Sequence, residues 1–194
     1  MKHDLENDSR WQRLNQRSWR CSGCGRDHSG LFDLVSDHPA SCSGQGATVS
    51  NSELRPDKSI LSDDFCIVDG EHYFIRCVLH LPIIGGAGSF FGFGVWTSLS
   101  PVNFATYAET FNDGTQGALG PWFGWLSSQL KGYPDTFLLK VMVRPQNERR
   151  RPEIELEPTS HPLALEQREG LTLDRILQLY ALNGHDISEV LADG

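Results

Sequence analysis

A pair of strand-like runs joined by a turn constrains the fold of this chain more than any other feature. Residues 65–68 and 73–79 are rich in aromatic and β-branched side chains, and the turn-forming residues 69–72 separate them. This arrangement predicts an antiparallel hairpin. A glycine-rich turn at 85–88 then leads into residues 90–99, a further aromatic and β-branched run, which we expect to form a third strand.

The other expected elements lie mostly after these strands. Capping and stop signals predict helices, and short alternating runs predict further strands. The expected helices are 101–111, a shorter helix from Pro121, 162–168 and 172–182, and the further strands are 137–144 and 153–157. Hairpin-connected strands without βαβ alternation are typical of an α+β fold. We therefore predict an antiparallel sheet with helices mainly on one face, plus an N-terminal Cys-x-x-Cys knuckle.

The 194 residues are expected to form one α+β domain over residues 19–194. Within it, the knuckle occupies residues 19–42, and the sheet and helices occupy residues 64–192. Residues 1–18 are polar and charged and lack strong apolar periodicity, so we expect a flexible N-terminal arm. Arginines near helical spacing in this arm leave open a short basic helix that binds a partner.

Charge and hydropathy argue against several classes of protein. The net charge of −8 argues against nucleic-acid binding, which needs a basic face. No run approaches the roughly 20 apolar residues that cross a bilayer, and the charged N-terminus lacks the apolar core of a secretion signal. We therefore expect a cytoplasmic protein without a nucleic-acid or membrane partner. Its five cysteines are then expected to stay reduced, as metal ligands, reactive thiols or core residues.

The strongest chemical signal is the Cys-x-x-Cys pair, Cys21 and Cys24. A tight turn aims two such thiolates at one tetrahedral metal, and zinc prefers these ligands. A closed zinc site needs four ligands, and His28, His38 and Cys42 are the candidates for the remaining positions. The sequence thus predicts a zinc knuckle. Structural thiols without metal and a redox Cys-x-x-Cys pair remain as alternatives.

Two more cysteines fall within the predicted hairpin. With a four-residue turn, Cys66 lies opposite Ile75, and Cys77 shares that face of the sheet two residues further on. Small apolar side chains in a strand are usually buried, and a thiol without charged neighbours behaves in this way. We therefore expect both thiols to be core residues and not metal ligands.

The strand over 90–99 has an unusual face. Phe90 and Trp96 share this face with Gly92 and Gly94, because side chains two residues apart in a strand point the same way. The two glycines leave a trough between the aromatic rings. We expect a helix backbone to pack into this trough, and a ligand or a peptide is the alternative occupant.

A second distinctive face carries three carboxylates. Glu153, Glu155 and Glu157 alternate with apolar residues along one strand. Like charges on one face repel unless they are compensated, and Lys140 and Arg144 of the preceding strand supply that compensation if the register is odd. The pattern predicts a solvated face with cross-strand ion pairs. A metal or basic-partner site using a nearby histidine is the alternative.

Several motifs, taken in order, carry a family resemblance. They are 21–28 (CSGCGRDH), 62–69 (SDDFCIVD), 72–76 (HYFIR), 94–100 (GVWTSLS), 123–126 (FGWL), 132–136 (GYPDT) and 155–164 (ELEPTSHPLA). Together they resemble the uncharacterised bacterial family called domain of unknown function 2199, over about residues 19–182. The resemblance implies a bacterial cytoplasmic setting and supports the domain assignment. It implies no reaction, substrate or oligomeric state.

Two functions follow from these features. The first hypothesis is a non-enzymatic binding or interaction protein with a structural zinc knuckle and a protein partner. The second is a small metal- or thiol-dependent enzyme that acts on an unidentified small molecule. No spacing singles out a pair of acid–base residues, and no nucleophile motif occurs. The sequence therefore assigns no catalytic residue.

Overall fold

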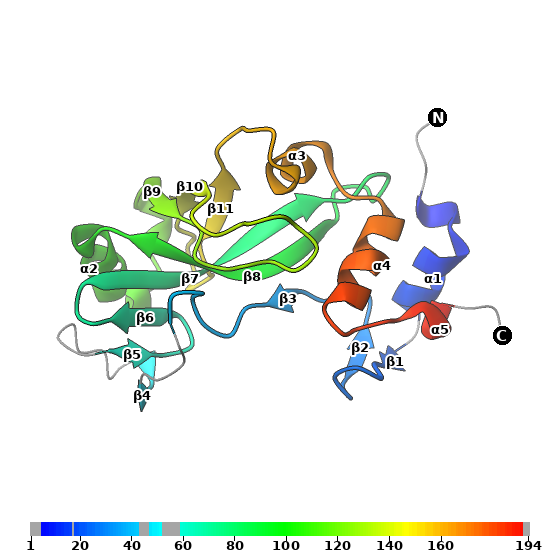
Figure 1. Cartoon of the computed structure of the whole chain (residues 1–194), viewed down its shortest axis with the longest axis horizontal. Coiled ribbons are helices and arrows are strands. Elements are labelled where there is room, and N and C mark those ends of the chain that lie inside the picture. Colours follow the sequence, from blue (N-terminus) through cyan, green and yellow to red (C-terminus); the bar gives the residue numbers. More distant parts are fainter. Residues whose placement is uncertain (1–4, 17, 43–46, 52–58, 192–194) are drawn as a thin grey trace.

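A computed structural model of the chain describes residues 5–16, 18–42, 47–51 and 59–191 (Figure 1). Its strands are β1 (Ser18–Arg20), β2 (Asp27–Ser29), β3 (Leu34–Val35), β4 (Ala47–Thr48), β5 (Ile60–Leu61), β6 (Phe65–Val68), β7 (His72–Pro82), β8 (Phe90–Leu99), β9 (Trp122–Trp125), β10 (Lys140–Arg144) and β11 (Glu153–Leu156). Its helices are η1 (Leu5–Asn7), α1 (Ser9–Gln16), α2 (Pro101–Thr110), η3 (Phe111–Asp113), η4 (Gln116–Ala118), α3 (Pro162–Glu169), α4 (Leu173–Leu182) and α5 (Ser188–Leu191).

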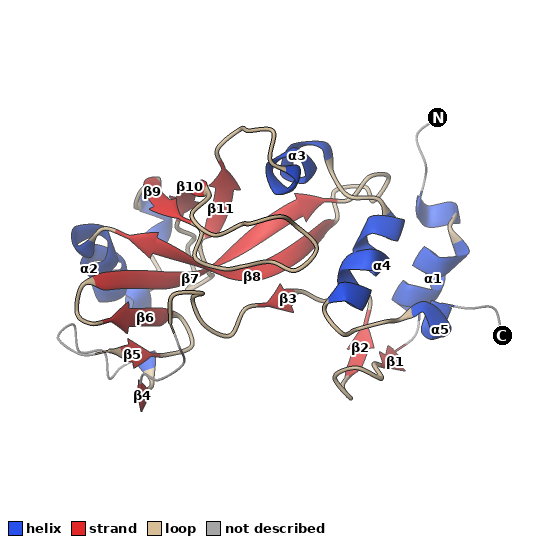
Figure 2. Ribbon diagram, in the orientation of Figure 1, coloured by secondary structure: helices blue, strands red, loops and turns tan. Residues whose placement is uncertain are grey.

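The predicted α+β class is confirmed, and strand β7 is the centre of the main sheet. β7 pairs with β8 along its whole length, and β6 and β11 share its other edge. Most pairings are antiparallel, but β3–β8, β4–β5 and β7–β11 are parallel, so the sheet is mixed. Helices α2 and α3 pack against β7, whereas α1, α4 and α5 gather beside β1 and β2 (Figure 2). The placement of the helices mainly on one face stays a prediction.

The strands after β8 curve back to meet it. From β7 the sheet continues through β11 and β10 to β9. The next residue, Leu126, forms an antiparallel bridge with Thr97 of β8. Gly124 permits this approach, because a Cβ atom at that position would lie 2.4 Å from the carbonyl oxygen of Ser98. Strands β7, β8, β9, β10 and β11 therefore enclose apolar side chains within a nearly closed ring.

The expectation of a helix from Pro121 is wrong. The residues that follow it form β9, which pairs with β10 in register Phe123 to Met142. Aromatic residues favour strands over helices, and the pairing partner, which the local sequence does not show, decides between the two. This strand is what returns the chain to β8.

The predicted hairpin exists, but its register differs by one residue from the expectation. Val68 pairs with His72, so the turn has three residues, two of which, Asp69 and Gly70, are left-handed with φ of 55° and 67°. A one-residue shift moves a side chain to the other face of the sheet. Cys66 consequently lies opposite Phe74 and not opposite Ile75.

The hairpin cysteines are buried, as expected, but they lie in different clusters. Cys77 belongs to the main core, whereas Cys66 packs with Cys42, Phe74 and Trp96 in a small second cluster. Burial, with Cys42 as a secondary cause, raises the pKa of the Cys66 thiol to about 12. Cys66 therefore remains a protonated, apolar packing residue at neutral pH.

The trough on β8 is filled by a strand of the same chain, and not by a helix or a ligand. A Cβ atom at Gly92 would lie 2.2 Å from Oδ1 of Asp33, and one at Gly94 would lie 3.2 Å from Cγ1 of Val35. Asp33 lies directly before β3 and Val35 belongs to it, and β3 pairs with β8 at Leu34. The glycines thus give β3 its place beside β8, and β3 in turn forms one wall of the pocket described below.

Residues 5–16, which we expected to belong to a flexible arm, form η1 and α1 in the structure. Leu5 and Leu14 are buried in the main core, and the carbonyl oxygen of Leu14 accepts a hydrogen bond from the amide of Gly30. Burial of these two leucines helps to hold the segment against the core, although two positions give no clear periodicity in the sequence. The domain boundary at residue 19 stays a prediction.

Asp8 caps α1, and we expect it to make the folding stability of the protein depend on pH. Its side chain bonds the amide and the guanidinium of Arg10, which lowers its pKa to about 2. A pKa lowered by folding stabilises the protein above the ordinary pKa and loses that effect as the pH falls towards 2. Asp8→Asn keeps the cap, so we expect it to cost about 1 kcal/mol at pH 7, after allowance for solvent screening, and less at pH 3.

Urea denaturation at both pH values checks this prediction. The control is Asp27→Asn, which alters an ion pair with Arg20 at 3.9 Å whose side chains are both more than two-thirds exposed. Such a pair contributes little, about 0.5 kcal/mol or less. An equal loss for both variants at pH 7 would contradict the role assigned to Asp8.

The carboxylate face has the predicted cross-strand ion pairs. Arg144 bonds Glu155 at 2.8 Å, and Nζ of Lys140 lies 3.5 Å from Glu157. Glu153 lies 3.8 Å from Nδ1 of His80 on the neighbouring β7. Glu155 and Glu157 are therefore each paired with a cationic side chain, and Glu153 lies beside a histidine. Within the described residues, no helix combines the length and the apolar character that a membrane span requires.

Candidate metal centre

The Cys-x-x-Cys knuckle is a turn between β1 and β2. Trp19 pairs with His28, and the amide of Cys21 bonds the carbonyl oxygen of Arg26 at 2.9 Å. The amide of Gly25 then bonds the carbonyl oxygen of Cys21 at 2.8 Å, and Gly25 has a left-handed φ of 68°. Glycine takes this conformation without strain. The turn therefore has a defined shape, and it carries both thiols of the motif.

The C-terminal segment reaches the same place after α4. Gly184 takes a left-handed φ of 81°, and the amide of His185 bonds the carbonyl oxygen of Tyr180 at 2.8 Å, which ends the helix and turns the chain back. The turn lies directly against the knuckle, since a Cβ atom at Gly23 would lie 1.7 Å from the carbonyl oxygen of Gly184. Only a glycine at position 23 allows this approach.

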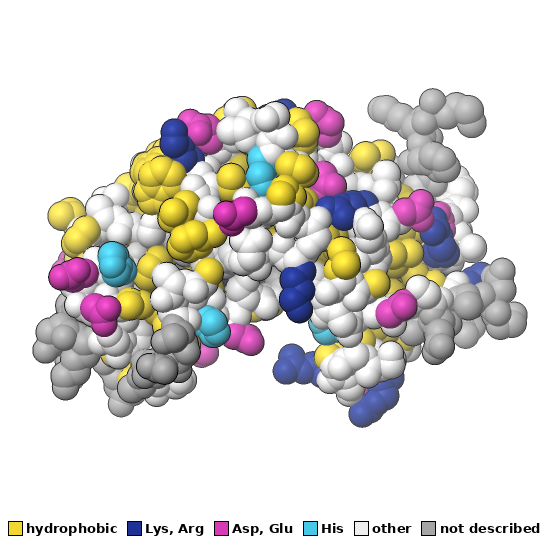
Figure 3. All heavy atoms as spheres, in the orientation of Figure 1, with side chains coloured by type: hydrophobic (Ala, Val, Ile, Leu, Met, Phe, Trp, Pro, Cys, Tyr) yellow, Lys and Arg dark blue, Asp and Glu magenta, His cyan; other side chains and the backbone are white. Residues whose placement is uncertain are grey.

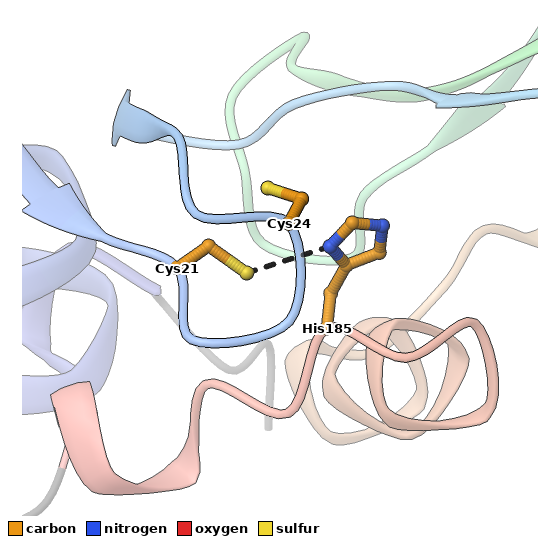
Figure 4. Close-up of side chains that lie close together, drawn as sticks. All are labelled: Cys21, Cys24 and His185. Atoms are coloured by element: carbon orange, nitrogen blue, oxygen red, sulfur yellow. Dashed lines mark hydrogen bonds between the residues drawn. The ribbon is translucent and has the colours of Figure 1, made fainter.

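Three side chains converge where the two segments meet. The sulfur atoms of Cys21 and Cys24 and a ring nitrogen of His185 all lie within 4.8 Å of one another. Figure 4 shows the sulfur of Cys21 pointing toward Nδ1 of His185, at 3.4 Å. In a tetrahedral zinc site with Zn–S of about 2.3 Å and Zn–N of about 2.1 Å, sulfur and nitrogen are about 3.6 Å apart. These three residues lie close enough together to hold a metal ion.

His28 offers a further donor next to Cys24, outside the three residues whose ligand atoms all lie within 4.8 Å of one another. Its Nε2 atom lies 3.2 Å from the sulfur of Cys24. The His28 ring stacks on Phe32 with a centroid separation of 4.0 Å, and the His185 ring meets the same phenyl ring edge-on at 5.1 Å. Phe32 therefore supports both imidazoles. The arrangement contains two cysteine–histidine pairs, one from within the knuckle and one across to the C-terminal segment.

Electrostatics favours a neutral imidazole at His185. The pKa of His185 is lowered, mainly by burial and to a smaller extent by the nearby His28. A neutral imidazole keeps a lone pair free for a metal, whereas a protonated one does not. Cys21 is almost fully buried, while Cys24 is exposed at the edge of the group. The site can thus be reached from solvent on the Cys24 side.

Comparison with known proteins adds one finding to this geometry. The model of the family DUF2199, described as an uncharacterised protein conserved in bacteria, matches residues 20–171, which is more than half of the chain. This protein belongs to the DUF2199 family. No curated protein and no solved structure matches it. The matched region of the DUF2199 chain includes Cys21, Cys24 and His28, whereas His185 lies beyond it.

Two of the five ligands proposed from the sequence lie elsewhere in this DUF2199 protein. Cys42 packs in the second cluster with Cys66 and Trp96. His38 is exposed, and its Nδ1 atom lies 2.9 Å from the carbonyl oxygen of Pro39. Of the five, the structure brings Cys21 and Cys24 together, and it places His28 next to Cys24.

His185 was not among the ligands proposed from the sequence. It lies 164 residues from Cys21, so no ligand spacing connects the two. The one local signal is its place directly after the helix-stopping pair Asn183 and Gly184. That signal locates a turn and does not show what the turn faces.

A pocket of about 510 Å³ opens beside this site. Its lining includes Cys24, His28 and His185, together with β3 and the segment 129–131. Arg26 also lines it, from the knuckle. The DUF2199 fold thus places a candidate metal centre in the wall of a cavity large enough for a small molecule.

Proposed function

We propose that this protein binds one zinc ion through Cys21, Cys24, His28 and His185 and that it acts as a binding or interaction protein. The ion holds the N-terminal knuckle against the C-terminal turn. A structural zinc site of this kind contributes directly to folding stability. The role requires no catalytic residue.

The observation that carries this proposal is the meeting of two cysteine–histidine pairs from distant parts of the chain. The separations of 3.4 Å for Cys21–His185 and 3.2 Å for Cys24–His28 are close to the sulfur–nitrogen edge of a zinc tetrahedron. Two thiolates with two imidazoles form a common structural ligand set for zinc, and thiolates disfavour the hard ions magnesium and calcium.

Metal analysis of the purified protein under reducing conditions tests the proposal. We expect one zinc per chain, lost in a Cys21→Ser, Cys24→Ser double variant because serine does not replace a thiolate ligand. The matched control is His38→Ala, which removes an exposed histidine outside the site and should leave the zinc content unchanged. A native protein that takes up no zinc would show that the two pairs are only thiol–imidazole hydrogen bonds.

The pocket favours a second candidate function, a metal-dependent enzyme. In that case Cys21, Cys24 and His185 hold the ion, and a water molecule facing the pocket takes the fourth position, as in catalytic zinc sites. Cobalt substitution of a His28→Ala variant separates the two functions. A structural site loses affinity and changes its visible spectrum in this variant, whereas a three-ligand catalytic site keeps both.

The proposal includes a protein partner and a cytoplasmic setting. Phe123 and Leu138, at 49% and 52% exposure, offer apolar surface for a partner near β9 and β10, where Figure 3 shows hydrophobic side chains gathered on the surface. All five cysteines are free thiols, which suits a reducing compartment.

A further inference from the structure

We infer that the pocket beside the metal centre binds a small molecule through an oxyanion, either a phosphate or a carboxylate group. The inference rests on the proposed function, because the zinc ion holds the knuckle that carries one of the two basic anchors. The inference adds a class of small-molecule ligand to a site in which the proposed zinc ion has only a structural role.

The two anchors are Arg26 and Lys131, which both line the pocket. Arg26 comes from the knuckle, and Lys131 comes from the segment that follows β9. Among the residues that the structure describes, neither side chain has an ion pair or a hydrogen-bond partner. Unpaired cations on the walls of one cavity attract an anion, and arginine matches the geometry of phosphate and carboxylate.

The charge balance of the pocket supports the same conclusion. Asp33 is the acidic residue in its wall, and a Cβ atom at Gly92 would lie 2.2 Å from the Asp33 carboxylate, so this group lies against β8. Two thiolates balance the charge of a bound zinc ion. The pocket therefore keeps an excess of positive charge, although the whole chain has a net charge of −8. An anion is therefore attracted to this local basic site, although the acidic surface of the rest of the protein repels it.

The pocket selects a ligand by charge and hydrogen bonds and not by aromatic stacking. Phe32 lines it, but His28 covers one part of the phenyl ring at 4.0 Å and Tyr180 stacks on it at 4.4 Å. No ring face of Phe32 is left for a planar ligand. Gln129 accepts a hydrogen bond from Thr136 through Oε1, so its amide NH₂ group remains as a further donor for an oxyanion.

Titration with inorganic phosphate and, separately, with succinate tests the inference and distinguishes a phosphate ligand from a carboxylate ligand. Isothermal titration calorimetry of the zinc-loaded protein should show saturable binding of at least one of these probes. Arg26→Ala and Lys131→Ala should each weaken it about tenfold, as expected for loss of one charge-assisted contact. The matched control is Arg150→Ala, which removes an exposed arginine outside the pocket and should leave the affinity unchanged.

The outcomes separate this inference from the proposed function. A protein that carries one zinc ion but binds neither probe overturns the anion pocket and leaves the metal site intact. The inference is also overturned if Arg150→Ala weakens binding as much as Lys131→Ala, because the effect would then be general electrostatics. Probe binding that depends on Lys131 in a protein without zinc supports the pocket and contradicts the proposed metal site.

Discussion

A Gly23→Ala variant is expected to lose its zinc although all four candidate ligands remain. The added methyl group would lie 1.7 Å from the carbonyl oxygen of Gly184 and 3.4 Å from Cα of His185. Backbone atoms cannot move aside as a flexible side chain can, so the C-terminal turn must leave the knuckle. His185 then no longer reaches Cys21, and we expect the zinc affinity to fall about 100-fold or more, the upper range for loss of ligand positioning.

Zinc content after dialysis and competition with a chromophoric chelator measure this effect. The matched control is Gly88→Ala, where an added Cβ meets nothing within 4 Å although this glycine has a left-handed φ of 86°. That control carries a backbone strain that Gly23→Ala does not, but it should keep its zinc. Unchanged zinc affinity in Gly23→Ala would show that the Gly184 turn does not lie against the knuckle.

The largest expected effect on folding stability comes from Trp96→Ala. Trp96 is completely buried, its indole N–H donates to the carbonyl oxygen of Ser36 at 3.0 Å, and the Arg76 guanidinium lies 4.9 Å from the ring centroid. Truncation leaves a large cavity in the second cluster and removes one of the two donors to the carbonyl oxygen of Ser36, the other being Arg76 at 3.2 Å. We expect the free energy of unfolding to fall by about 3–5 kcal/mol in urea denaturation.

Trp96→Phe is the matched variant for this prediction. A phenyl ring keeps most of the packing against Arg76 but cannot donate to Ser36, so we expect a smaller loss of about 1–3 kcal/mol. The difference between the two variants measures the cavity. If Trp96→Ala lost less than about 1 kcal/mol, the second cluster would not be a packed part of the core.

Local patterns predicted the strands β6, β7, β8, β10 and β11 correctly. The hairpin strands, β8 and the carboxylate strand β11 each have alternating or continuous runs of residues that favour strands, and such runs are visible in a short window of sequence. The ion pairs of Lys140 and Arg144 also followed, because strand periodicity places the charged side chains of each strand on one face and the register of β10 and β11 is the odd one that the pairing required.

The errors in the fold arose where a distant partner decides the structure. A run of aromatic residues after Pro121 became β9 because β10 pairs with it. The register of the hairpin depends on one residue in the turn, and the local sequence fits both lengths. The N-terminal helix is ordered by burial of Leu14 against the rest of the molecule.

The candidate site divides in the same way. The sequence by itself determined the α+β class and the pairing of Cys21 with Cys24, because a strand, a tight turn and a Cys-x-x-Cys motif depend on neighbouring residues. Only the tertiary structure decided that His185 joins them and that Cys42 and His38 do not. The contact between Gly23 and Gly184 joins segments far apart in the chain, and their meeting depends on how the whole core packs.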